Sequence, residues 1–263
     1  MNISLVNTYY PNQKLHTTFT SCAKLYNPKK ITNLDIFSKN YIRTTSNIFR
    51  DDEDWDYLMK YILLNFFSKK QVNIYSLGCS DGSEPYTYAL YLKSKLPKEH
   101  LKKFSQIIAC DINPEMIRVA KSGFINLSPE DIRNIKKYVK NAGQYLQDTG
   151  DPILICGNVY TDQKSFKFSR EITKMIKFKK SDILTEVKAL EDDGNSVVNI
   201  RNVFPYLNNE YVDEILKNLS QKLKTGSMFV FGRYDHQIPN FRNRLHNLGF
   251  TSPVSFENFV IKM

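Results

Sequence analysis

The sequence predicts a doubly wound α/β domain built around a mostly parallel sheet. Short apolar segments alternate along the chain with longer segments whose apolar residues recur every three or four positions, which is the pattern of strands alternating with helices. The 263 residues are 41% hydrophobic and 13% aromatic, enough for one sizeable core and a small appendage. This composition also argues against a disordered chain.

The first predicted element is a helix at residues 54–67, where apolar side chains recur at helical spacing. A strand at 72–77 then runs into a glycine-bounded turn and a helix at 84–96. The later elements are a strand at 106–109, a helix at 114–122, strands at 175–178 and 196–200, a helix at 209–223, a strand at 228–231, and apolar runs at 250–254 and 259–263. The last two runs leave no room for a helix between them, so we expect them to form an antiparallel hairpin.

Two segments fall outside this alternation. Residues 141–170 hold short β-like pieces separated by glycine and aspartate turns, which predicts a small inserted β-subdomain. The pieces are residues 153–156, 159–160 and 166–168. Residues 1–40 are polar and weakly periodic, so we expect a variable N-terminal arm, irregular or partly helical, ahead of a main domain at 41–263.

The net charge of +10 favours acidic partners, whether nucleic acid, an anionic membrane surface or a carboxylate-rich protein. The charge is spread along the chain, and a solvated basic surface explains it equally well. The sequence has no lysine and arginine cluster interleaved with aromatic residues, which would mark a nucleic-acid face. Nucleic acid is therefore the weaker candidate, although it is not excluded.

Cysteine spacing and hydropathy indicate the cellular compartment in which the protein is expected. The four cysteines are far apart and form no C-x-x-C pair, so neither a metal site nor a disulfide framework is indicated. They are Cys22, Cys79, Cys110 and Cys156. No apolar run approaches the roughly 18 residues needed to cross a bilayer, and no secretory leader is visible. We therefore expect a reducing cytoplasm.

The most informative segment is the strand, turn and helix at residues 74–89. Gly78 and Gly82 bound the turn with G-x-x-x-G spacing, which differs from dinucleotide and phosphate-loop motifs. Glycines let the backbone approach a ligand closely, and the helix that follows presents free N–H groups. Asp111, after the next strand, is placed to accept the hydroxyls of a ribose. Glu84 suits a cationic nucleoside ligand such as S-adenosylmethionine; the alternative is a tight turn without a ligand.

Four segments now share the order and approximate spacing of one family's motifs. They are TTSNIFR at 44–50, GCSDGSEPY at 78–86, AKSGF at 120–124 and NIRNVFPYL at 199–207. Together they resemble the CheR family of chemoreceptor glutamate methyltransferases over about residues 41–235. The resemblance implies a class I methyltransferase fold, which is Rossmann-like, with a mostly parallel seven-stranded sheet, a C-terminal antiparallel hairpin and a small inserted β-subdomain. It also implies S-adenosylmethionine as methyl donor, with S-adenosylhomocysteine as product.

The resemblance assigns roles to individual positions. The implied cofactor-binding residues are Thr44, Ser46, Arg50, Gly78, Gly82, Glu84, Asp111, Asp182, Ile183 and Asn202. Asp182 and Ile183 fall where the family contacts adenine, although Asp182 could instead cap the following turn. Tyr206 matches the tyrosine bordering the methyl group, and Arg201 could hold the acceptor carboxylate; both are candidate catalytic residues. In the alternative interpretation, Arg50 is a surface ion-pair partner and Tyr206 a core aromatic.

The implied reaction methylates a protein glutamate carboxylate to a methyl ester, with a receptor-like acidic segment as partner. A carboxylate is already ionised at neutral pH, so the reaction depends on positioning and needs no general base. One alternative is the same fold acting on a small molecule or RNA. Another is a catalytically degenerate sensor or scaffold that binds S-adenosylmethionine. Ser83, in place of the first of the family's paired glutamates, and Pro205, beside Tyr206, keep this last alternative open.

Overall fold

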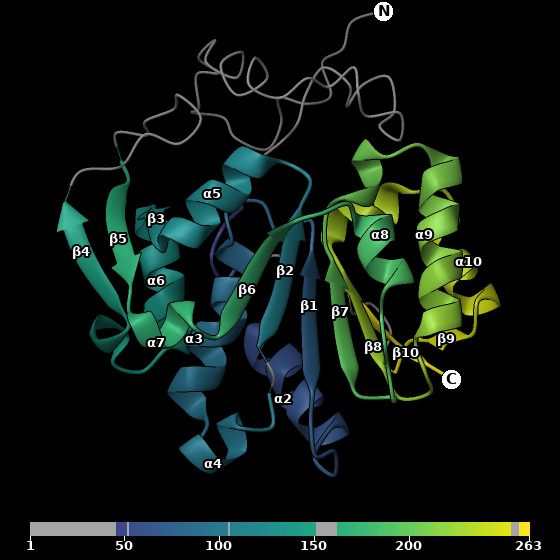
Figure 1. Ribbon diagram of the computed structural model, residues 1–263, viewed down its shortest axis with the longest axis horizontal. Helices are drawn as coiled ribbons and strands as arrows, with labels where there is room; N and C mark the ends of the chain where they lie inside the picture. The colour runs from purple at the N-terminus through teal and green to yellow at the C-terminus, as the bar shows by residue number, and fades with distance from the viewer. Residues whose placement is uncertain (1–45, 52, 105, 151–161, 254–257) are drawn as a thin grey trace, which may run out of the picture.

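The computed structural model describes residues 46–51, 53–104, 106–150, 162–253 and 258–263 (Figure 1). The described residues form a sheet of seven strands in the order β6-β2-β1-β7-β8-β10-β9. These strands are β1 (Asn73–Leu77), β2 (Ile107–Asp111), β6 (Ile176–Lys180), β7 (Ser196–Ile200), β8 (Met228–Phe231), β9 (Phe250–Thr251) and β10 (Phe259–Lys262). Neighbouring strands from β6 to β8 pair in parallel, whereas β10 is antiparallel to both β8 and β9. The predicted mostly parallel sheet with a C-terminal antiparallel hairpin is confirmed.

Helices cover both faces of this sheet (Figure 1). One face packs against α2 (Trp55–Asn65), α3 (Ser83–Lys95) and α5 (Pro114–Ser122), and the other against α8 (Ile183–Lys188), α9 (Asn209–Lys222) and α10 (Phe241–Asn247). The central strand β7 divides the two cores, since Val197 belongs to the first and Val198 to the second. Successive side chains of a strand point to opposite faces, so a strand buried on both sides is apolar almost throughout.

A second sheet has three antiparallel strands in the order β3-β5-β4. They are β3 (Phe124–Leu127), β4 (Leu146–Gly150) and β5 (Lys164–Phe168), with α6 (Pro129–Tyr138) and the short helix η3 (Ala142–Gln144) between β3 and β4. The predicted piece at 166–168 lies in β5, whereas 153–156 and 159–160 lie outside the described residues. Two strands fall within the predicted insertion at 141–170, but the sheet also takes β3 from earlier in the chain.

Three short or outlying features complete the description. The helices α4 (Lys98–Leu101) and α7 (Arg170–Thr173) were not expected from the sequence. No helix in the described ranges is long and apolar enough to cross a membrane. The predicted arm at 1–40 lies outside the described residues.

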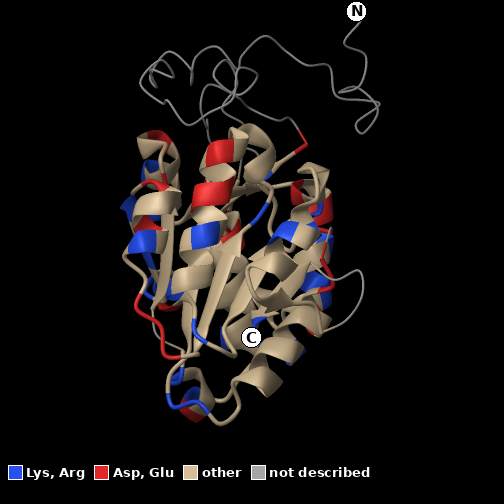
Figure 2. Ribbon diagram, turned by 90° about the vertical axis from the view of Figure 1, so that its right-hand side faces the viewer, with Lys and Arg blue, Asp and Glu red and all other residues tan. Residues whose placement is uncertain are grey.

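Charged side chains of both signs are mixed on the α9 and α10 side of the molecule (Figure 2). Several are paired there: Lys188 with Glu214 at 2.7 Å and Arg244 with Asp213 at 3.1 Å. The positive net charge is therefore not gathered into a single basic patch on this side.

Candidate functional site

The cofactor turn, residues 78–82, joins β1 to α3. Gly78 and Gly82 have φ of +84° and +90°, a region that side chains with a Cβ rarely adopt. A Cβ on Gly78 would lie 2.8 Å from Val203 Cγ2, and one on Gly82 would lie 3.0 Å from Ala120 Cβ. The glycines are thus required by the backbone conformation and by close packing of the turn on neighbouring segments.

Asp111, the last residue of β2, holds this turn in place. Its Oδ2 accepts a hydrogen bond from the Ser80 N–H at 2.8 Å, and its Oδ1 accepts one from the Asn113 N–H at 2.8 Å. Desolvation raises the pKa of Asp111, while these N–H groups lower it. A carboxylate oxygen can accept more than one hydrogen bond, so this geometry also leaves acceptor capacity for ligand hydroxyls.

Asp182 is the N-cap of α8, as the alternative interpretation of this residue expected. Its Oδ1 accepts hydrogen bonds from the N–H groups of Leu184 at 2.9 Å and Thr185 at 3.4 Å, and from the Tyr211 hydroxyl. The next residue, Ile183, is 9% exposed, and its Cδ1 would lie 3.4 Å from a Cβ on Gly78. The carboxyl end of β6 therefore meets the cofactor turn.

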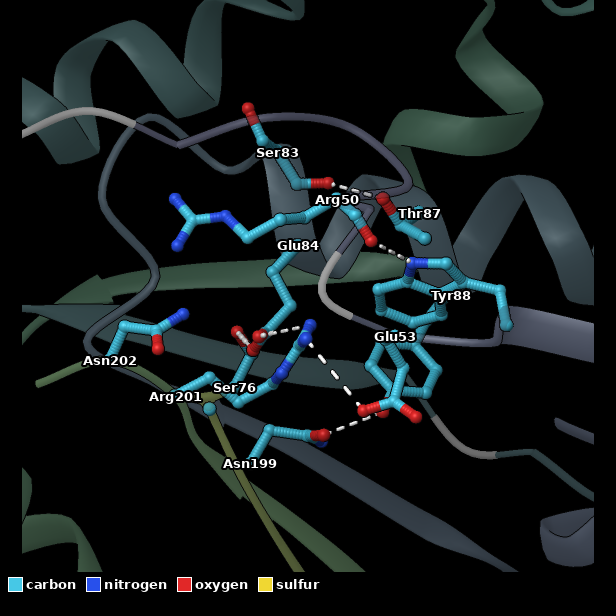
Figure 3. A network of polar contacts seen from close by, with 12 residues as sticks. Arg50, Glu53, Ser76, Ser83, Glu84, Thr87, Tyr88, Asn199, Arg201 and Asn202 are labelled. Atoms are coloured by element: carbon cyan, nitrogen blue, oxygen red, sulfur yellow. Dashed lines mark hydrogen bonds and ion pairs between the residues drawn. The ribbon is translucent and has the colours of Figure 1, made fainter. Parts of the chain in front are cut away.

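A buried ion-pair network lies behind the turn (Figure 3). Arg201, just after β7, places Nη1 3.5 Å from Glu84 Oε2 and Nη2 3.8 Å from Glu53 Oε2. Ser76 Oγ donates to Glu84 Oε1 at 2.7 Å, and the guanidinium lies 5.1 Å from the centre of the Trp55 ring. The exposed fractions of the Arg201, Glu53 and Glu84 side chains are 4%, 2% and 15%. Arg201 is thus surrounded by groups of the protein itself.

The network continues into the sheet through α3. The Tyr88 hydroxyl donates to Asn199 Oδ1 at 2.5 Å (Figure 3). Asn199 Nδ2 donates in turn to the Tyr75 carbonyl at 2.8 Å. The side chains of Tyr88 and Asn199 are fully buried, and their hydrogen bonds satisfy groups that would otherwise be costly to bury.

Residues 201–206 follow β7 and are held from the loop after β8; we call them the acceptor loop after the role expected of Tyr206. Asn202 has φ of +58°, and its Oδ1 accepts from the Tyr234 N–H at 2.9 Å. Asp235, in the short helix η5 (Arg233–Gln237), is fully buried and accepts hydrogen bonds from the loop backbone. Burial raises the pKa of Asp235 to about 7, while the hydrogen bonds and Arg201 lower it. Tyr206 ends the helix η4 (Phe204–Tyr206) and is half-buried.

The segment before α2 is held by hydrogen bonds to α3 and α6. The Phe49 N–H donates to Thr87 Oγ1 of α3 at 2.9 Å, and Asn134 Nδ2 of α6 donates to the Phe49 carbonyl at 3.3 Å. Desolvation raises the pKa of Asp81 in the turn to about 6, and the charge of Arg50, the residue after Phe49, acts in the opposite direction.

Ser83, which replaces a glutamate of the family pattern, has a local partner. Its Oγ and its N–H both donate to Asp81 Oδ1, at 2.7 and 3.0 Å. The side chain therefore stabilises the end of the cofactor turn, at a position that is fully buried from solvent.

Most predicted site residues gather at one edge of the large sheet. Gly78, Gly82 and Glu84 follow β1, Asp111 ends β2, Asp182 and Ile183 follow β6, and Arg201, Asn202 and Tyr206 follow β7. Ser46 and Arg50 precede α2, and Thr44 lies outside the described residues. In open α/β sheets, ligands bind in the crevice beyond the carboxyl ends of the strands, which is where these residues lie.

Two residues of the site were not found from the sequence. Glu53 stands in the run D-D-E-D, which has the composition of a solvated acidic turn. Asp111 ends its strand, whereas Asp235 lies beyond the end of β8, within η5, so the signal that identified Asp111 does not single out Asp235.

The comparison with known proteins agrees with this geometry. A model of the family "CheR methyltransferase, SAM binding domain" matches residues 44–253. The chemotaxis protein methyltransferase of Borreliella burgdorferi is 28% identical over 216 residues, covering 80% of this chain and 68% of that protein. The protein of the same name from Listeria monocytogenes is 22% identical over 202 residues, covering 76% of this chain and 68% of that protein.

Solved structures align more loosely. A precorrin-6y C5,15-methyltransferase from Geobacter metallireducens has a TM-score of 0.40 and 10% identity, over 82% of this chain and 90% of that one. The family match, in contrast, spans most of the chain and every segment of the candidate site. This chain belongs to the CheR family of S-adenosylmethionine-dependent methyltransferases.

Proposed function

We propose that this enzyme methylates a glutamate carboxylate of a chemoreceptor-like protein, forming a methyl ester. The observation that carries the proposal is the contact between the cofactor turn and the acceptor loop, where Val203 packs against Gly78. A methyl donor held at the turn would lie beside the loop that carries Tyr206. The receptor is proposed as substrate because the relatives are named as chemotaxis methyltransferases.

The residues at the sheet edge fit S-adenosylmethionine. Asp111 keeps acceptor capacity for ribose hydroxyls. Asp182 and Ile183 are proposed to contact adenine, and Gly78 and Gly82 to form the floor of the site. Thr44, Ser46, Arg50, Glu84 and Asn202 are proposed as further cofactor contacts on the strength of the family pattern alone. When bound, the cofactor supplies an electrophilic methyl group on a positively charged sulfur.

The charge of the site suits that cation. Arg201 lies between two acids, Glu53 and Glu84, so the ionised network carries a surplus negative charge close to the turn. Because Arg201 is 4% exposed, we propose that it holds these two acids in place and does not bind the acceptor carboxylate. The attacking carboxylate needs no proton removed, and Tyr206 would orient it for in-line approach.

Isothermal titration with S-adenosylmethionine and S-adenosylhomocysteine tests the cofactor site, and labelled methyl transfer tests the product. A carboxyl methyl ester releases volatile labelled methanol in mild alkali, whereas methylated amines and RNA bases retain the label. Release from a receptor fragment, lost when its glutamates are glutamines, would support the proposal. Alkali-stable label would point to the alternative acceptors, and cofactor binding without any transfer would point to a sensor.

Replacing Asp111 with alanine should weaken S-adenosylmethionine binding by about 1–3 kcal/mol, because a charged acceptor for the ribose is lost. Titration calorimetry measures the change. Loss of the turn contact at Ser80 could weaken binding too, so a 2′,3′-dideoxy analogue of S-adenosylhomocysteine serves as control. This analogue should bind the wild type and the variant alike, and an equal loss for both ligands would reject the ribose assignment.

Asp182→Ser separates the capping role of Asp182 from a role in adenine binding. Serine is also a good N-cap, so the free energy of unfolding should change by less than about 1 kcal/mol. If the carboxylate accepts from the exocyclic amine of adenine, S-adenosylmethionine affinity should still fall by about 1–3 kcal/mol. Tyr211→Phe, which removes only the hydroxyl bonded to Asp182, controls for that contact. Unchanged affinity in Asp182→Ser would leave the residue as a cap only.

A further inference from the structure

Asp235 joins the loops that follow β7 and β8. Its Oδ2 accepts hydrogen bonds from the N–H groups of Asn202 at 2.8 Å and Gly232 at 2.7 Å. Its Oδ1 accepts from those of Val203 and Phe204, both at 3.1 Å. The carboxylate is fully buried, so it has exchanged water for these N–H groups of the backbone.

The acceptor loop depends on such an acceptor. Asn202 adopts φ of +58°, and the N–H groups of three consecutive residues then point to one place. Buried N–H groups without an acceptor would each cost about 1–3 kcal/mol. The carboxylate satisfies all three together, which a single carbonyl oxygen could not do.

The Asn202 side chain adds a second link between the acceptor loop and η5. Its Oδ1 accepts from the Tyr234 N–H at 2.9 Å, next to the carboxylate in the chain. A Cβ on Gly232 would lie 2.1 Å from that oxygen, so only glycine leaves space for it. We call Asn202, Gly232 and Asp235 the loop clamp.

We propose that Asp235 is a positioning residue for methyl transfer, acting through the acceptor loop. The clamp fixes Val203 against the cofactor turn and Phe204 in the core, where its ring lies 5.6 Å from that of Phe241. Tyr206, whose N–H donates to the Val203 carbonyl at 3.0 Å, is then held at the sheet edge. This inference rests on the proposed function insofar as Tyr206 faces the acceptor.

The test compares Asp235→Asn and Asp235→Glu in the full chain. Asparagine offers one acceptor oxygen and turns an amide group toward the N–H groups, so kcat for methyl transfer should fall about 100-fold. S-adenosylmethionine affinity should fall far less than kcat, since the proposed contacts Asp111 and Asp182 are untouched and only Asn202 belongs to the clamp. Asp235→Glu restores the charge and should recover part of kcat. Asp213→Asn, which removes an exposed carboxylate on α9, is the matched control and should leave kcat unchanged.

A purely structural role would reduce the folded fraction without changing kcat per folded molecule. An unchanged kcat in folded Asp235→Asn, or cofactor affinity falling in step with kcat, would overturn the proposal. If Asp235→Asn does not fold, Gly232→Ala perturbs the same clamp while keeping the carboxylate, and the same loss of kcat is expected.

Amide hydrogen exchange tests the loop clamp without any methyl acceptor. The N–H groups of residues 202–204 should be protected in the wild type and exchange faster in Asp235→Asn, while β7 stays protected. Equal protection in both proteins would reject the clamp even if methyl transfer is observed. A wild type with protected amides but no transfer to any receptor fragment would instead reject the proposed function.

Discussion

Replacing Arg201 with methionine should lower the free energy of unfolding by about 3–5 kcal/mol, because breaking a buried ion pair leaves an uncompensated charge. The guanidinium lies between Glu53 and Glu84, whose side chains are 2% and 15% exposed. Methionine can still pack on Trp55, so the loss of charge dominates the effect. Urea unfolding at neutral pH measures it.

A double-mutant cycle and an exposed pair provide the controls. Adding Glu53→Gln to Arg201→Met removes one of the stranded acids, so the double variant should regain stability, with a coupling of about 0.5–3 kcal/mol. Arg244→Met breaks the pair with Asp213, whose carboxylate side chain is 61% exposed, and should cost less than about 1 kcal/mol. A similar small cost for Arg201→Met would mean that the buried network contributes little to stability.

The segment from β1 to β2 could be predicted because its information is local. An apolar strand, two glycines at fixed spacing, an immediate helix and an acid after the next strand are all read within residues 72–111. Their physical reasons are equally local: positive φ at Gly78 and Gly82, and hydrogen bonds from the turn to Asp111. The parallel pairing of the strands then followed from the alternation with helices.

The rest of the site depends on contacts between distant parts of the chain. Glu53 is an acid whose partner, Arg201, follows a strand far along the sequence, so no local pattern distinguishes it from a solvated side chain. The role of Asp235 likewise depends on N–H groups that the fold brings from the loop after β7. Which charged side chains and backbone groups meet at the sheet edge depends on the order of the strands in the sheet. A single sequence predicts the strands themselves but not these contacts.

Short elements were missed for a different reason. β3 has four residues, Phe124–Leu127, too few for a periodicity of two to stand out. α6 did carry a readable signal, since Ser128 and Asp131 form a capping box ahead of a helix with proline at its start. Capping motifs at the start of a helix therefore predict more of residues 124–138 than hydrophobic periodicity does.

Removing the ring of Tyr206 should lower methyl transfer by at least about 100-fold, because the acceptor would no longer be positioned at the donor. Tyr206→Ala should bind S-adenosylmethionine within about threefold of the wild type, since Asp111 and the cofactor turn lie on other strands. The rate of labelled methyl transfer and the calorimetric affinity for S-adenosylmethionine, measured on the same preparation, check the two expected results.

The contribution of the hydroxyl can be separated from that of the ring. Tyr206→Phe keeps the ring and removes only the hydroxyl. A loss of rate close to that of the alanine variant would assign the effect to the hydroxyl, and a small loss of rate would assign it to the ring. Tyr234→Phe, on the neighbouring η5 and 37% exposed, is the matched control and should change the rate by less than about threefold. Cofactor affinity that falls together with the rate would place Tyr206 in the binding site. An unchanged rate in Tyr206→Ala would make it a packing residue of the acceptor loop, because a side chain that orients the attacking carboxylate cannot be removed without slowing the transfer.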